Sequence, residues 1–241
     1  MRALLASLLL LLLAAPDARA ERVVAGLSQE AISITTNFDG SEILIFGAVR
    51  REAPPPGQEP LQVIVTVQGP PRPVTVRRKD RRFGIWVNTE AAEVDAAPTF
   101  YAVSTSAALE DVLSDTADLR LRVSIPRAIR AVDTAVTDQR AFTDALIRIR
   151  SDGALYQLNE GAVTFRQQTL FDTSIRLPAN LVEGDYRARI LLTRGGEVVD
   201  VFEQTLPVRK VGLERIIYTL AHERPLIYGI LSLVIAIVAG W

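Results

Sequence analysis

The densest group of charged side chains in the sequence is residues 77–82 (RRKDRR), where five of six residues are cationic. A basic cluster of this kind binds anionic surfaces such as lipid headgroups or acidic proteins. The flanking residues alternate as strands do, so we predict that this segment is the charged tip of a hairpin, where charge also discourages edge-to-edge pairing. The candidate interaction residues here are Arg77, Arg78, Arg81, Arg82 and the nearby Trp86.

A second group of polar side chains occupies residues 36–42 (TNFDGSE), which are rich in oxygen donors. A calcium loop needs alternating ligands and a Glu at its twelfth position, and this pattern is absent. The Asp-Gly pair instead favours a β-hairpin turn. Phe38 and Asp39 at that turn are candidate contact residues, because aromatic side chains anchor many interfaces.

The other residues of the sequence give no sign of a catalytic site. The chain has no Cys and a single His, His222, which excludes disulfides, thiol catalysis, Cys-based zinc sites and His clusters. Carboxylate pairs such as Glu110/Asp111 and Glu183/Asp185 occur in segments typical of solvated helix and turn positions. Nucleotide-binding glycine patterns and the Gly-x-Ser-x-Gly pattern are also missing. We therefore predict a non-enzymatic protein without catalytic, cofactor or metal residues. The 27 basic and 28 acidic residues give no nucleic-acid signature.

The first twenty residues have the three parts of a secretory signal peptide: a basic start, an apolar run from Ala3 to Ala15, and small residues at Ala18 and Ala20. We predict cleavage after Ala20. An uncleaved anchor is the alternative, but the apolar run is shorter than a membrane span needs.

Residues 225–241 contain no charge and have the length of a short membrane span, about 25 Å of helix. Tyr228 and Trp241 suit the two membrane interfaces. We predict a C-terminal transmembrane helix here. With the signal peptide, it predicts a single-pass inner-membrane protein with a periplasmic ectodomain and its C-terminus at the cytoplasmic face.

Short alternating segments separated by turn residues fill the region between the two ends and predict a mainly β ectodomain of immunoglobulin-like sandwich type. We predict one sandwich over residues 21–128, including a strand at 119–125. Residues 129–210 are predicted to form a helix, at 138–150, and a second, smaller sandwich. Whether these regions are one domain or two stays open.

Residues 211–224 are predicted to form an amphipathic juxtamembrane helix. Leu213, Ile216, Ile217 and Leu220 recur at helical spacing. Ile216 and Leu220 are candidate contacts to the bilayer surface or to a partner's transmembrane region. Packing on the ectodomain is an equal alternative.

Four segments carry a family resemblance: residues 34–48 (ITTNFDGSEILIFGA), 84–88 (GIWVN), 177–180 (LPAN) and 209–215 (RKVGLER). On these segments the chain resembles the alphaproteobacterial putative transmembrane protein family, which is uncharacterised. The resemblance implies a signal peptide, a periplasmic region and one C-terminal span. It also implies a possible membrane-protein partner, a sulfite-exporter-type permease. It assigns no catalytic residues.

From these observations we expect a β-sandwich interaction module that assists a membrane partner such as a transporter. A ligand-binding or sensing ectodomain for a small anion or sulfur compound is the alternative. A carboxylate-dependent hydrolase of envelope polysaccharide is a third.

Overall fold

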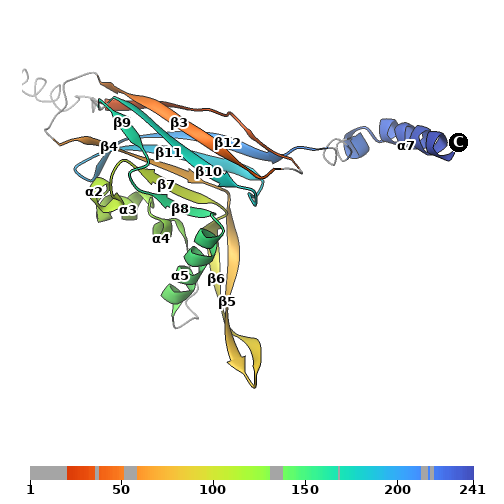
Figure 1. Ribbon diagram of the computed structural model, residues 1–241, viewed down its shortest axis with the longest axis horizontal. Helices are drawn as coiled ribbons and strands as arrows, with labels where there is room; N and C mark the ends of the chain where they lie inside the picture. The colour runs from red at the N-terminus through yellow and green to blue at the C-terminus, as the bar shows by residue number, and fades with distance from the viewer. Residues whose placement is uncertain are drawn as a thin grey trace, which may run out of the picture.

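The computed structural model describes residues 21–35, 38–51, 59–130, 138–167, 169–212, 217 and 220–241. The predicted signal peptide lies outside these residues. The described chain is mainly β, with two large sheets stacked face to face and a layer of short helices beneath them (Figure 1). The predicted mainly β, sandwich-like arrangement is therefore confirmed.

The smaller of the two large sheets, sheet A, has four antiparallel strands. In spatial order they are β1 (Glu21–Leu27), β3 (Gly40–Arg51), β10 (Leu170–Pro178) and β9 (Thr164–Arg166). Sheet B has six strands, and the pairs at its two edges are parallel. Their order is β2 (Ile32–Ile34), β12 (Glu197–Lys210), β11 (Gly184–Arg194), β4 (Leu61–Gln68), β7 (Tyr101–Thr105) and β8 (Tyr156–Asn159).

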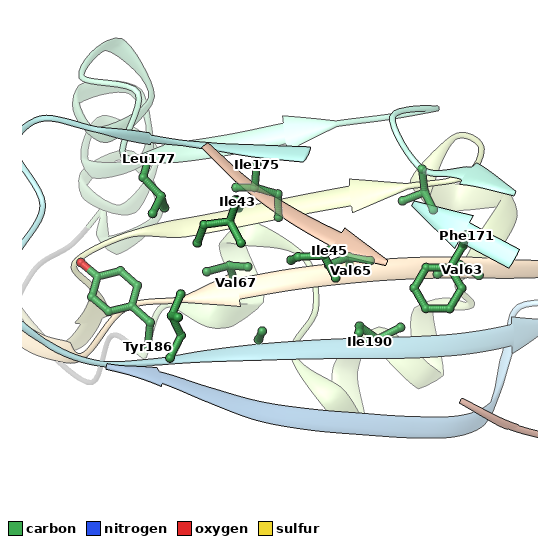
Figure 2. Packing of buried hydrophobic residues seen from close by; sticks show 14 of the residues in the cluster. Ile43, Ile45, Val63, Val65, Val67, Phe171, Ile175, Leu177, Tyr186 and Ile190 are labelled. Atoms are coloured by element: carbon green, nitrogen blue, oxygen red, sulfur yellow. The ribbon is translucent and has the colours of Figure 1, made fainter. Parts of the chain in front are cut away.

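The main core lies between these sheets and follows the strand period of two. Ile43 and Ile45 of β3 point inward together with Ile175 of β10, and all three are fully buried. They face side chains of β4 and β11 such as Val65 and Ile190 (Figure 2).

Strand β4 is buried on both faces, because its second face meets the helical layer. Ile64 of β4 joins a second core with Phe142 and Leu146 of the longest helix of that layer. The helices are α2 (Leu109–Val112), α3 (Asp115–Leu121), α4 (Ile125–Ala128) and α5 (Gln139–Asp152). The predicted helix at 138–150 is confirmed as α5, whose N-cap Asp138 accepts from Ala141 N.

A separate two-stranded ribbon, formed by β5 (Pro71–Arg82) and β6 (Ile85–Pro98), projects from the sheets (Figure 1). Its first half lies beside α5, and its far end extends beyond every other element around it (Figure 1).

The division into two sandwich units differs from the structure. β3, from the first predicted unit, pairs along its length with β10 from the second, and β4 likewise pairs with β11. Both β-regions therefore build one pair of sheets. Local periodicity predicts strands but holds no information about which distant strands pair.

The predicted strand at 119–125 is wrong, because α3 and α4 occupy this segment. Ser114 caps α3, and the carboxylate of Asp118 accepts from the backbone N–H groups of Val123 and Ser124. These polar contacts stabilise a helix end and a tight turn. The apolar alternation of the segment, which is typical of a strand, gave no indication of them.

The predicted C-terminal transmembrane helix is also wrong. Helix α7 (Pro225–Gly240) is apolar but has 16 residues, which is about 24 Å of helix against a hydrocarbon core of about 30 Å. Among the described residues, none of the helices combines the length and apolarity that crossing a membrane requires. Of the predicted juxtamembrane residues, Leu220 is half-buried in a short helical turn, and Ile216 lies outside the described residues.

Candidate functional site

The structure brings five of the candidate residues together on the β5–β6 ribbon. Arg77, Arg78, Arg81 and Arg82 follow one another on β5, and Trp86 lies on β6. None of them is buried.

The turn of the ribbon lies beyond the cationic segment and not within it, so the predicted position of the tip is corrected. Phe83 and Gly84 have φ of 50° and 85°, the left-handed pair of a type I′ turn. Glycine adopts this conformation without cost, and nothing lies within 4 Å of a Cβ added at Gly84. Residues 79–82 therefore continue β5 toward the turn.

Phe83 occupies a position that turn chemistry would fill with Asn, Asp or Gly. Its side chain is fully exposed, at 105% of its reference area, so it adds nothing to the core. A bulky side chain in the left-handed region costs about 1–2 kcal/mol. Strain without compensating packing is typical of functional positions.

The two strands of the tip differ in character. The cations lie on β5, whereas Ile85 and Trp86 of β6 are 64% and 69% exposed. In the register Arg82 opposes Ile85 and Arg81 opposes Trp86. Because successive side chains of a strand point to opposite faces, each face of the ribbon carries one of these cation–apolar pairs. We call residues Lys79–Val87 the ribbon tip.

The other half of the ribbon, its root, is packed. Val76, Ala92 and Val94 are buried in the second core. Arg78 marks the boundary: its guanidinium lies 4.9 Å from the ring centre of Phe142 and 2.9 Å from Glu90, with Asp138 of the α5 N-cap at 3.8 Å. A register shift follows between Arg78 and Lys79.

A buried tyrosine, Tyr156, holds the end of the root in place. The Tyr156 hydroxyl donates to Pro98 O at the end of β6, and the Tyr101 hydroxyl donates to Val123 O. Burial raises the pKa of both hydroxyls to about 12, although Arg189 near Tyr101 and Arg150 near Tyr156 partly oppose the shift. Burial also raises the pKa of Tyr186. These groups stay neutral and serve as structural donors.

Phe38 and Asp39 do not join the ribbon. Strand β2 enters sheet B beside β12 and β3 lies in sheet A, so the predicted hairpin between them is absent. Phe38 is half-buried against the main core, while Asp39 is exposed. Phe38 is therefore less exposed than an aromatic at a hairpin tip would be, and its role as a contact residue stays a prediction.

The sequence analysis missed an apolar patch on the outer face of sheet A. Its exposed members are Val24, Leu44, Phe46 and Leu170. The available indication was that β3 is apolar on both alternating faces. Among the described residues, only the face of Ile43 and Ile45 is covered.

The carboxylates considered above as possible catalytic pairs lie at positions where they serve the fold. Asp185 accepts from Arg209 at 2.6 Å, and Glu110 and Asp111 lie in the first turn of α2. The buried Glu21 is ion-paired with Arg51 at 3.0 Å and Arg194 at 2.9 Å, which fixes the start of β1. Within the part of the chain that the structure describes, no three His, Asp or Glu side chains group as a metal site.

A comparison with known protein families finds a match over nearly the whole chain. The model of the family described as "Putative transmembrane protein" matches residues 22–241. The chain belongs to this family. No curated protein matches it.

Among solved structures, the chain is similar to the crystal structure of Spo0M, a sporulation control protein from Bacillus subtilis. The match has 11% identity and a TM-score of 0.28, and it covers 83% of this chain. The chain spans about half of that protein, 54% of its length.

Proposed function

We propose that this family member is a non-enzymatic interaction module, exported to the periplasm, whose β-sandwich holds the ribbon against a partner at the inner membrane. The ribbon tip carries the proposal: it combines exposed apolar side chains and cations on a ribbon that projects from a packed root (Figure 1). Aromatic and Arg side chains supply most of the binding energy in protein interfaces. A membrane transporter is one such partner.

The arrangement of the cations favours a macromolecular partner over a small anion. Five cations are spread along six consecutive residues of a β5 strand whose side chains alternate between faces. Their charged groups therefore do not converge on one point. A broad surface can contact several of them at once.

Affinity capture from detergent-solubilised membranes tests the proposal. The baits are the full chain, a Phe83→Ser/Trp86→Ser variant, and a Phe46→Ser variant that removes an exposed ring from sheet A. We expect a reproducible membrane partner with the first and third baits and its loss with the second. Identical partners with all three baits would contradict the proposal. Recovery of the chain alone would also contradict it if the Phe83→Ser/Trp86→Ser variant sediments with intact membranes as the parent chain does.

A further inference from the structure

We propose that the surface which the ribbon tip binds is the anionic headgroup layer of a lipid bilayer, into which Phe83, Ile85 and Trp86 insert. This inference rests on the proposed function, because it names the partner of the same ribbon.

The chemistry of the tip fits an anionic interface. The chain as a whole has a formal net charge of −1, yet residues 77–82 hold five cations and a single anion, Asp80. Each Lys or Arg near an anionic bilayer contributes about fivefold in affinity. Trp is the residue typical of the headgroup level, because its ring is apolar and its N–H can still donate to polar groups.

The shape of the tip favours a bilayer over a protein surface. A stable protein interface buries about 800 Å² on each partner, usually on one face of an element. Here both ribbon faces carry a cation beside an apolar side chain, with Phe83 at the apex. A flat partner would contact one face, whereas headgroups surround an inserted tip on all sides.

The length of the tip also fits insertion into the headgroup layer. The residues from Lys79 to Phe83 extend about 15 Å beyond Arg78, which contacts α5. The headgroup region of one leaflet is about 5–8 Å thick. The apex can therefore reach the acyl boundary while the packed root stays in water. The backbone strain at Phe83 is then offset only when the ring enters the bilayer.

Trp86 is a reporter within the tip itself. The chain has two Trp residues, so a Trp241→Phe background leaves the emission of Trp86 alone. We expect vesicles of phosphatidylcholine with 30% phosphatidylglycerol to shift this emission to shorter wavelength, and brominated lipids to quench it. Pure phosphatidylcholine vesicles should do neither. High salt should reverse the shift, because it screens the cations.

Variants separate the contribution of the cations to vesicle binding from that of the apolar side chains. In the same background Arg81→Gln/Arg82→Gln should weaken vesicle binding about 25-fold, and Phe83→Ser should weaken it about tenfold. The matched controls are Arg176→Gln/Arg187→Gln, which changes the net charge equally at exposed strand positions, and Phe46→Ser. Both controls should bind like the parent chain.

Because the vesicles contain no protein, this experiment is independent of partner capture. An unchanged Trp86 emission while the chain sediments with vesicles would overturn the inference, since another segment would then hold the lipid. Tip-dependent capture of an acidic membrane protein without any response to vesicles would also overturn it and leave the proposed function standing. Loss of both responses would overturn both.

Discussion

The root and the tip of the ribbon are built from the same two strands but have opposite surroundings. In the root, Val76, Ala92 and Val94 are buried against the helical layer. In the tip, from Lys79 to Val87, no residue is buried. The difference shows that strand pairing alone can extend a ribbon well past the core once one end is held by packing. Stability is therefore concentrated in the root, and the tip is available for binding.

The largest expected effect of a single substitution is at the root. Phe142→Ala removes a buried ring that packs in the second core and lies under Arg78. We expect the free energy of unfolding to fall by about 3–5 kcal/mol, as for other buried Phe truncations. Denaturant unfolding measures the loss. Trp86→Ala, an aromatic truncation in the tip, is the control and should leave the midpoint unchanged. Equal losses would contradict the contrast between root and tip.

Alkaline pH should also weaken the root. The pKa of Tyr156 is raised from 10.0 to about 12, so the unfolded chain loses this proton first as the pH rises. The stabilisation is complete below about pH 10 and is lost as the pH rises toward 12.

We expect Tyr156 to account for about 1 kcal/mol of the fall in unfolding free energy between pH 9 and pH 11. Urea titrations at the two pH values should show a shallower fall for Tyr156→Phe than for the parent chain. Tyr228→Phe, at an exposed position of α7, should not alter it. The same slope in all three proteins would refute the assignment.

A smaller effect is expected at the boundary between root and tip. Arg78→Gln removes the contacts with Glu90, Asp138 and the Phe142 ring. These groups are partly exposed, so the loss should be about 1 kcal/mol. Arg77→Gln, on the opposite face of β5, is the matched control. A thermal melt that shifts equally for both would show that the boundary contacts contribute nothing specific.

The smallest effect on stability is expected at the turn, where the substitution should stabilise the protein. Phe83→Asn places a residue that tolerates the left-handed region where φ is 50°. The melting temperature should rise by about 2 °C while binding to the partner or to vesicles falls. Scanning calorimetry and the vesicle assay on one preparation measure both. A decrease in melting temperature would mean that the Phe83 ring stabilises the fold.

Much of the local structure could be predicted from the sequence. The alternation in 186–193 and 198–208 and the helical spacing in 138–150 correspond to β11, β12 and α5. The cationic segment and Trp86 were also apparent as candidate residues. The turn was predicted within the cationic segment 77–82, but it lies just after it at Phe83 and Gly84, where the backbone φ is positive.

Two aromatic residues, Phe38 and Phe46, show what local pattern leaves open. The Asp-Gly pair predicted a hairpin turn beside Phe38, and no local signal distinguished Phe46 from its apolar neighbours. In the structure Phe38 packs against the main core, because β2 and β3 enter different sheets. Phe46 is exposed, because the outer face of sheet A has no covering layer among the described elements.

The sequence by itself determined the strand-rich composition, the place of α5 and the chemical character of the ribbon, since period and residue type act over a few neighbours. Only the tertiary structure decided that both β-regions share two sheets, which faces of the strands are covered, and that α5 supports the ribbon at Arg78. Pairing and burial depend on contacts between residues far apart in the chain, which no local window contains.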